Sequence, residues 1–499
     1  MKKAILQFVI IGILISSFSG ILHAQPAIKG AEYITQTQLT ETVKFLCQPG
    51  LDGRQAASDG YKKAVDYMSA EFKKLGLTPL GNNGYLQEVP VEYTEITGTP
   101  VLEILSGSRM INSFVHGTEF TCRANTGSGD VSAEVVFCGY GISEPSLGYD
   151  DYSPIDVKGK IVMVFKQNPS WKIEGLDYSD VLTRYKTKKA IEHGALAVLF
   201  VAVPNVKDPQ KPIGSLMDGK GIYEINIPQL QIDIPTANEF LAGTAFSLSQ
   251  LEQRIDSLKQ PFGLPLKISA HVNVESKYYP QRTSWNVVGM LKGSSSVQSS
   301  EYLVLGAHLD HVGRQGNNLY YPGANDNASG SAAVLQLARA FVNGNVRPAR
   351  SIIFVLFTSE EQGLNGSEFF AKNLPVPLEK IVAMFNLDCI GSGDSIQVGS
   401  GKSSPVLWDI AHKNDSLYTK KMVAQTWSGG GADATPFFNI GIPTLYFVSK
   451  YSYTHLHLPT DTPETLNAEL FEKIVTLAFI TASEVLKGGY LREILITAP

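Results

Sequence analysis

The stretch YLVLGAHLDH, at residues 302–311, decides the fold class of this chain. Its first six residues form a nearly continuous apolar run, which predicts a buried strand, and polar residues follow where that strand ends. Similar patterns recur along the chain: strands at 352–357, 381–387 and 442–448, and helices near 328–342 and 467–487. This alternation is typical of a parallel sheet covered by helices. We therefore expect an α/β fold, with a mixed, mostly parallel sheet sandwiched by helices.

Five short polar motifs accompany these predicted strands, and four of them lie at or just beyond a strand's carboxyl end. They are GAHLDH at 306–311, GANDNASG at 323–330, TSEE at 358–361, NLD at 386–388 and HLPTDT at 457–462. Taken alone, each has an ordinary explanation, such as a helix cap at Asp326 or Ser329 or a solvated loop at the paired glutamates. Together they favour one site, because open α/β sheets bind ligands at the carboxyl ends of their strands.

The residue types in these motifs favour a divalent metal, and zinc above others. Histidines and carboxylates without cysteine suit a borderline-to-hard dication. The candidate ligands are His308, Asp326, Glu361, Asp388 and His457. Two dications held by three carboxylates would keep one net positive charge. If both metals are present, that balance suits hydrolysis by two Zn²⁺ ions per chain.

The first 24 residues have the layout of a secretory signal peptide. Lys2 and Lys3 precede an apolar run from Ala4 to Ile15, and Ala24 offers a small residue for cleavage. A membrane anchor is the alternative, but the run is shorter than the ~20 residues that a span requires. We expect a secreted or periplasmic protein without a membrane span after cleavage.

Composition narrows the class of protein further. The 499 residues carry 42 Lys and Arg against 47 Asp and Glu, a net charge of −5. This slightly acidic balance argues against a nucleic-acid-binding protein, which is usually basic. A chain of this length predicts two or three domains. Of the four cysteines, Cys122 and Cys138 either pair or stay free, and Cys389 reads as a buried thiol. No CxxC motif occurs, which argues against a thiolate zinc site.

The region before the motifs divides into two parts. Apolar residues at helical spacing over 61–75 predict an amphipathic helix, capped by Ser58 or Asp59 and ended by Gly76. From 100 to 280 the pattern changes to short strands, such as 134–138 and 160–165, with the Pro/Gly-rich stretch 204–235 read as loops. No set of metal ligands gathers there, so we interpret 100–280 as a separate β-rich module.

On these motifs the chain resembles the secreted co-catalytic zinc aminopeptidases, which are related to plasma glutamate carboxypeptidase and glutamate carboxypeptidase II. The module at 100–280 is similar to their protease-associated insertion, through GYG at 139–141, YDDY at 149–152 and DVKGKIV at 156–162. The resemblance covers nearly all of residues 25–499. It implies a catalytic domain in two pieces, 25–99 and 281–499, interrupted by 100–280.

The resemblance also implies a role for each residue that matches the family's motifs. His308 and Asp388 would bind one zinc, Glu361 and His457 the other, and Asp326 would bridge them. Glu360 would act as the general base, and the Asp310 carboxylate would hold the His308 ring through its other nitrogen.

Three positions differ from the family pattern or leave it ambiguous. Asn325 stands where relatives often have Asp, and Asp433 lacks the histidine that often follows it. His455 competes with His457 as a ligand, and the spacing to Asp461 favours His457.

The implied function is a metallo-exopeptidase, above all an aminopeptidase that acts on peptides with a free N-terminus. A dipeptidase or carboxypeptidase of the same fold is the nearest alternative. A glutaminyl cyclase with one zinc and a non-catalytic binding protein are more distant alternatives. The preferred substrate residue and the oligomeric state stay open.

Overall fold

The structure is a computed structural model that describes residues 28–217, 219 and 221–495. The predicted signal peptide at 1–24 lies outside the described residues. Within the described part of the chain, no helix combines the length and the apolar character needed to cross a membrane.

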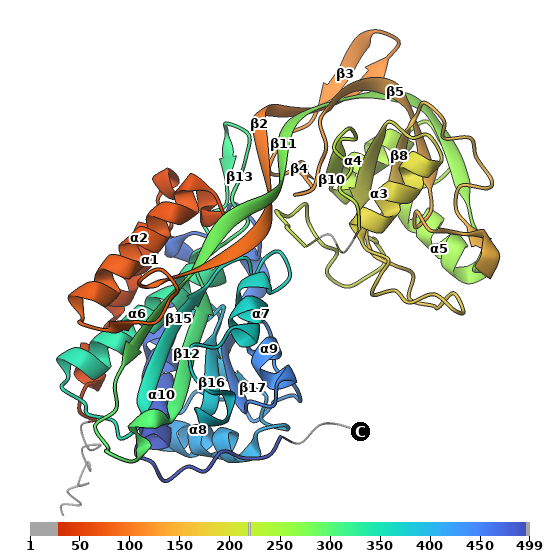
Figure 1. The fold of residues 1–499 in the computed structure, drawn as a ribbon. Helices are drawn as coiled ribbons and strands as arrows, with labels where there is room; N and C mark the ends of the chain where they lie inside the picture. The colour runs from red at the N-terminus through yellow and green to blue at the C-terminus, as the bar shows by residue number, and fades with distance from the viewer. Residues whose placement is uncertain (1–27, 218, 220, 496–499) are drawn as a thin grey trace, which may run out of the picture.

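The chain forms two lobes joined by a pair of long strands (Figure 1). We call residues 107–262 the small lobe and the rest of the described chain the large lobe. The joining strands are β2 (Leu86–Ser106) and β11 (Gly263–Leu291), which pair antiparallel along most of their length. The domain boundaries predicted at 99/100 and 280/281 therefore fall inside strands that continue from one lobe into the other.

The large lobe is built on the predicted strands, and the expectation of a mixed, mostly parallel sheet is confirmed. Its strand order is β17-β18-β16-β12-β15-β11, with parallel pairing from β18 to β15 and antiparallel pairing at both ends. The strands are β12 (Tyr302–His308), β15 (Ser351–Phe357), β16 (Ile381–Leu387), β17 (Ser395–Gly399) and β18 (Thr444–Lys450). Parallel pairing brings the carboxyl ends of β12, β15, β16 and β18 to one edge.

Helices cover both faces of this sheet. Alternate side chains of β12 show the division, because Leu303 and Leu305 pack into one apolar cluster and Val304 into another. The first cluster includes side chains from α1 (Gln36–Leu46), α2 (Asp59–Lys74), α6 (Ser329–Asn343), α8 (Pro405–Leu417) and α10 (Ala468–Leu486). The second includes side chains from α7 (Asn365–Lys372) and α9 (Ala434–Asn439). The sheet is therefore the middle layer of three.

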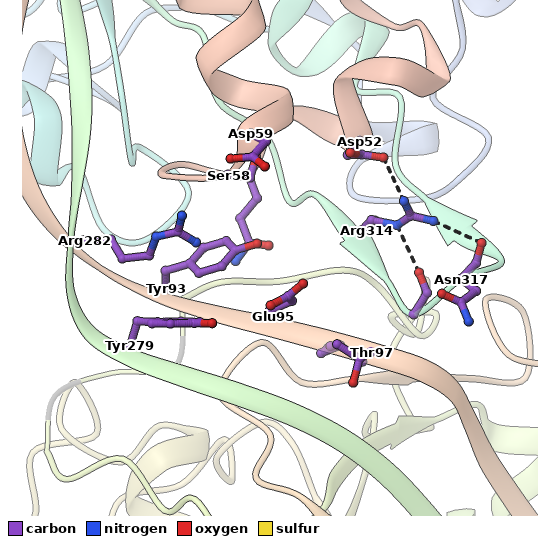
Figure 2. Close-up of a pocket in the computed structure, with 13 residues that line it drawn as sticks. Asp52, Ser58, Asp59, Tyr93, Glu95, Thr97, Tyr279, Arg282, Arg314 and Asn317 are labelled. Carbon is purple, nitrogen blue, oxygen red and sulfur yellow. Dashed lines mark hydrogen bonds and ion pairs between the residues drawn. The ribbon is translucent and has the colours of Figure 1, made fainter.

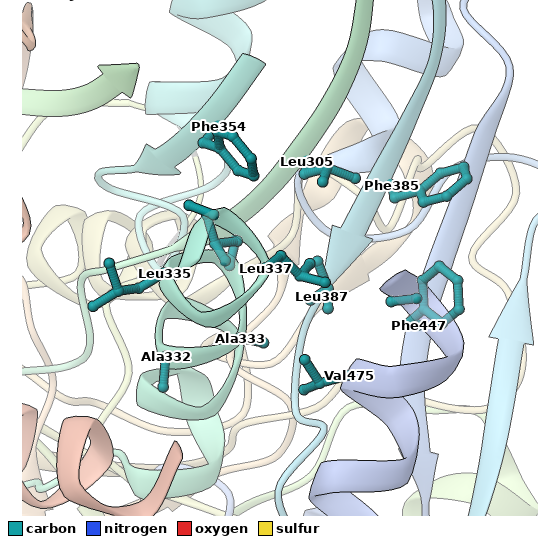
Figure 3. Packing of buried hydrophobic residues seen from close by; sticks show 14 of the residues in the cluster. Leu305, Ala332, Ala333, Leu335, Leu337, Phe354, Phe385, Leu387, Phe447 and Val475 are labelled. Carbon is teal, nitrogen blue, oxygen red and sulfur yellow. The ribbon is translucent and has the colours of Figure 1, made fainter. Parts of the chain in front are cut away.

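Helix α6 lies at the centre of this packing (Figure 3). Its Ala332 and Ala333 let the helix approach its neighbours closely, and Leu337 lies near Leu305 and Leu387 of the sheet. Each such leucine contributes roughly 1.5–3 kcal/mol through burial. Because the helix is held on several sides, the loop that leads into it is fixed as well.

The helix ends match their sequence signals. The Ser58 side chain accepts the Tyr61 backbone N–H at the start of α2, and the Asn467 side chain accepts that of Leu470 at the start of α10. Gly76, just past α2, and Gly488, just past α10, have positive φ angles of 70° and 94°. The predicted helix at 61–75 therefore forms with its expected caps, and the helix predicted near 467–487 has caps of the same kind.

The small lobe continues the same sheet in the order β11-β5-β8-β9-β10-β4. Its strands are β4 (Phe120–Cys122), β5 (Gly129–Cys138), β8 (Ile161–Phe165), β9 (Ala197–Val201) and β10 (Gln229–Ile232), and its helices are α3 (Thr183–Glu192), α4 (Ile234–Leu241) and α5 (Leu248–Leu258). The prediction of loops throughout 204–235 is wrong at its end, since 229–232 form β10. That short polar-apolar run is a strand because it pairs between β9 and β4.

The four cysteines are buried and free. The pair between Cys122 and Cys138 that the sequence left open is therefore not formed, whereas Cys389 is the buried thiol that was expected.

Candidate metal centre

The sheet edge brings the five predicted ligand residues together. His308 is the last residue of β12, Asp388 directly follows β16, and Glu361 lies four residues past β15. His457 comes from the loop after β18, and Asp326 from the irregular segment Ala324–Ala328 that leads into α6. The parallel strand order explains this convergence, because residues far apart in sequence leave the sheet at the same edge.

Asp326 lies between the two predicted histidine ligands. Its Oδ1 atom is 3.3 Å from Nε2 of His308, and its Oδ2 atom is 3.0 Å from Nε2 of His457. Asp388 Oδ1 lies 3.5 Å from the same His308 nitrogen, and Glu361 Oε2 lies 3.0 Å from the same His457 nitrogen. The site therefore has two halves that share one carboxylate.

The buried charge of this cluster requires compensation. Burial by itself lowers the pKa of His308 and of His457, yet the surrounding carboxylates raise both well above their usual value. In the other direction, burial raises the pKa of Asp326, but hydrogen bonds from the same two histidines hold it well below its usual range. The buried carboxylates thus strongly favour a positive charge beside them, as buried anions usually do.

Asp310 contacts His308 through a different atom from the one expected. The His308 Nδ1 atom lies 3.1 Å from the backbone carbonyl oxygen of Asp310, whereas the Asp310 carboxylate is 3.7 Å away. That carboxylate instead accepts the backbone N–H groups of Glu360 and Glu361. Asp310 therefore fixes the turn that carries both glutamates, and its main chain orients the histidine ring.

Glu360 lies at the open side of the cluster. Its side chain is 16% exposed, against 1% for His308, and its Oε2 atom is 4.0 Å from Nε2 of His308. Burial raises the pKa of Glu360 well above the usual carboxyl value; His308 offsets part of this effect, and Asp433 adds to it. A partly accessible carboxyl with a raised pKa suits a group that accepts and returns a proton.

Asp461 and Asn325 hold the loop that carries Asp326. The Asp461 carboxylate accepts the backbone N–H groups of Asn325 and Asp326 at 2.9–3.1 Å. The Asn325 side chain accepts N–H groups from Gly391 and Ser392 and donates its own N–H to the Ser452 carbonyl. A carboxylate at 325 would lack the donor for Ser452, so the departure from the family pattern fits its surroundings.

Sequence reasoning assigned no role to His311, although it lies within the GAHLDH motif. This histidine is fully buried, and its Nδ1 atom is 2.8 Å from Oε1 of Glu361. The contact leaves the other Glu361 oxygen facing His457. The signal in the sequence was the position itself, three residues after His308 and at the same end of the strand.

The two remaining uncertain positions have distinct surroundings. His455 lies outside the cluster and its Nδ1 atom pairs with the Thr460 hydroxyl at 2.9 Å. Asp433 is fully buried, and its charge raises the pKa of Glu360. The structure thus brings His457 rather than His455 into the cluster.

The donor set fits a pair of dications. His308, Asp326 and Asp388 offer ligand atoms within 4.8 Å of one another, and so do His311, Asp326 and Glu361. Asp388 Oδ1 is buried and has no hydrogen-bond partner among the described residues. An unpaired buried carboxylate oxygen that faces a histidine nitrogen is the arrangement that a cation between them would satisfy.

A separate polar hollow of about 380 Å³ contains none of these ligands (Figure 2). It lies where β2 and β11 pass the hairpin of β13 (Arg314–Gln315) and β14 (Leu319–Tyr320). Arg314 pairs with Asp52 at 2.9 Å, and the Arg282 guanidinium lies 4.5 Å from the centre of the Tyr93 ring. Its two arginines are thus engaged, Arg314 with a carboxylate and Arg282 with the tyrosine rings.

Comparison with known proteins agrees with the family resemblance. Residues 286–481 match the model of peptidase family M28. The aminopeptidase YwaD of Bacillus subtilis (strain 168) is 25% identical over 354 residues, which are 68% of this chain and 66% of YwaD. An aminopeptidase of Pseudomonas aeruginosa (strain UCBPP-PA14) is 27% identical over 356 residues, 70% of this chain and 56% of the relative. The chain thus spans less than two thirds of these curated relatives.

The fold is shared with a solved structure of a Bacillus subtilis protein described as a zinc aminopeptidase. The two superimpose with a TM-score of 0.62, at 19% sequence identity, over 93% of this chain and 98% of the other. The arrangement of both lobes therefore has a known counterpart.

Proposed function

Because residues 286–481 match the model of peptidase family M28, we propose that the chain is a zinc metallo-exopeptidase. Its activity would be that of an aminopeptidase, which releases N-terminal residues from peptides. The observation that carries the proposal is the position of Asp326, whose two carboxylate oxygens each face a different histidine at 3.0–3.3 Å. The aminopeptidases to which the chain is similar support the same activity.

In this proposal His308 and Asp388 would hold one zinc ion, and Glu361 and His457 would hold the other. Asp326 would be the ligand that the two ions share. When bound, such ions polarise the scissile carbonyl and lower the pKa of water, which is their usual contribution to hydrolysis.

Glu360 is the proposed general base. It takes the proton from the attacking water and returns it to the amine that leaves, which requires a group that is both accessible and close to the cluster. Its 16% exposure and raised pKa support that role. Asp310 supports it indirectly, since its carboxylate holds the backbone of Glu360.

The proposal extends to the parts of the chain outside the cluster. We infer that the small lobe is the protease-associated insertion expected from the sequence, with a catalytic domain split around it. We also infer export to the periplasm or the exterior, led by a signal peptide at 1–24. The alternation of glycine and charged motifs at 139–162 and the Lys2–Ala24 pattern support these two inferences.

The decisive experiment uses the mature protein with blocked and unblocked substrates. We expect two zinc ions per chain by metal analysis, cleavage of amino-acid p-nitroanilides, and no cleavage of the same anilides after N-acetylation. Hydrolysis of C-terminal residues from N-blocked peptides would establish a carboxypeptidase instead. One zinc with cyclisation of N-terminal glutamine would establish a cyclase, and absence of turnover on all these substrates would leave a binding protein.

A further inference from the structure

The small lobe contacts the metal centre directly, through the segment 212–217, which we call the strap. The backbone N–H of Gly214 donates to the backbone carbonyl of His457 at 3.0 Å. Figure 1 shows that loops of the small lobe reach toward the large lobe. A proposed zinc ligand is thus hydrogen-bonded to the opposite lobe.

The strap is itself held firmly within the small lobe. The Thr121 hydroxyl donates to the Ile213 carbonyl at 3.2 Å. The buried Arg123 side chain donates to the Ser215 hydroxyl at 3.2 Å and lies 3.5 Å from the Met217 carbonyl. The strap therefore presents the Gly214 N–H from a fixed position.

Close packing on the large lobe explains why residue 214 is a glycine. A Cβ atom there would lie 2.8 Å from Cγ2 of Val312 and 3.0 Å from the Tyr321 ring. Both side chains are buried in an apolar cluster that also contains Leu216 of the strap. The backbone of Gly214 does not have a positive φ, so space, rather than backbone conformation, excludes a side chain at this position.

The orientation of the His457 side chain depends on how its main chain is held. Its φ angle is 54°, in the left-handed region that residues other than glycine seldom adopt. Its Nδ1 atom is buried without a hydrogen-bond partner in the described part of the chain. Histidine ligands of metals are usually oriented by a hydrogen-bond partner on that second nitrogen. Here the hydrogen bond from Gly214 to the His457 backbone carbonyl holds the residue instead.

We propose that the strap positions His457 for metal binding, so that the small lobe is a structural part of the second zinc site. The inference rests on the proposed function, because it requires that His457 binds zinc. It assigns Gly214 as a positioning residue that acts through His457. Displacing the strap should weaken the zinc held by Glu361 and His457 and leave the zinc held by His308 and Asp388 in place.

The test displaces the strap with Gly214→Val and uses Gly243→Val as its matched control. Gly243 is also in the small lobe, but a Cβ there meets nothing closer than 3.8 Å. For Gly214→Val we expect one of the two zinc ions to bind about 10–100-fold more weakly in chelator competition. Zinc-free Gly214→Val should also exchange the amide hydrogens of 455–458 faster than the wild type. Gly243→Val should match the wild type in both measurements.

A gentler variant covers the case in which Gly214→Val does not fold. Thr121→Val removes the hydroxyl donor to Ile213 with little change in volume, and it should weaken the same zinc by a smaller factor. Unchanged affinity for both ions in Thr121→Val and in any folded Gly214→Val would overturn the inference alone. A wild-type protein that binds no zinc would refute the proposed function as well, so the two failures are distinguishable.

Discussion

Asp310 and Glu360 are joined by a hydrogen bond of 3.2 Å, from the backbone N–H of Glu360 to Oδ1 of Asp310. The other oxygen of Asp310 takes the N–H of Glu361 at 3.4 Å. One buried carboxylate thus holds two successive glutamates in a fixed turn. Glu361 points to His457, while Glu360 lies near His308, and this difference in direction underlies the first prediction.

Glu360→Gln and Glu361→Gln should fail in different ways. Glu360→Gln removes proton transfer but no ligand, so kcat should fall about 10²–10⁴-fold with zinc content unchanged. Glu361→Gln weakens a charged ligand, so zinc should be lost and excess zinc should partly restore activity. Metal analysis beside steady-state kinetics separates the two. Loss of zinc in Glu360→Gln with full occupancy in Glu361→Gln would reverse the assigned roles.

Replacement of Asp326 should affect both halves of the site at once. Asp326→Ala removes the oxygens that face His308 and His457, so both zinc ions should bind more weakly and activity should vanish. Zinc stoichiometry by native mass spectrometry is the measurement. Retention of two ions per chain in this variant would contradict the bridging role.

The histidine that the sequence did not single out can be tested against one that it did. His311→Phe keeps a planar aromatic ring but removes the Nδ1 contact to Glu361, so we expect about 10–100-fold weaker binding of one zinc. His455→Phe is the matched control and should bind zinc as the wild type does, since His455 contacts Thr460 instead. Equal zinc affinities for the two variants would show that His311 has no such role.

Arg54 should be among the most sensitive positions for stability. Its buried guanidinium donates to the backbone carbonyls of Leu46, Leu309, Pro322 and Gly323 at 2.6–3.0 Å. Arg54→Met should lower the free energy of unfolding by about 3 kcal/mol or more, because each buried carbonyl left unpaired costs about 1–3 kcal/mol.

The control for Arg54 is Arg314→Met. Arg314 is half-exposed and pairs with Asp52 at the surface, so its loss should cost no more than about 1 kcal/mol. Denaturant titration of the zinc-free proteins makes the comparison without interference from metal binding. Similar losses for both variants would contradict the structural role of Arg54.

The stability of the protein should show a pH dependence that originates at His271, on the joining strand β11. Partial burial lowers the pKa of His271, but Glu103 and Asp130 flank the ring at 3.1 and 2.9 Å and raise it above the usual value of 6.5. The stabilisation is therefore complete below pH 6.5 and is lost as the pH rises through the raised pKa. Melting temperatures across pH 6–9 should fall more for the wild type than for His271→Gln. Identical pH profiles would contradict this assignment.

The order of strands and motifs could be predicted from the sequence, because each apolar run of the large lobe is long, uninterrupted and followed by polar residues. The residues of the cluster were predictable for the same reason. His311 and Asp461 were not, since a histidine and a helix-starting Asp-Thr-Pro give no local sign of what they contact. The strap was missed because its significance lies entirely in contacts between segments far apart in the sequence, Gly214 with His457 and Val312 with Leu216 among them.

The paired strands β2 and β11 determine how a minimal version of this protein should be made. Because they run antiparallel, with Thr94 opposite Tyr278, a short Asn-Gly turn could join them near this pair and replace everything between. A deletion that ignores this register would leave part of one strand without its partner, and the exposed backbone N–H and C=O groups would promote aggregation. The shortened chain would keep the three layers of the large lobe and lack the strap. It would thus show what the large lobe can do without the small lobe.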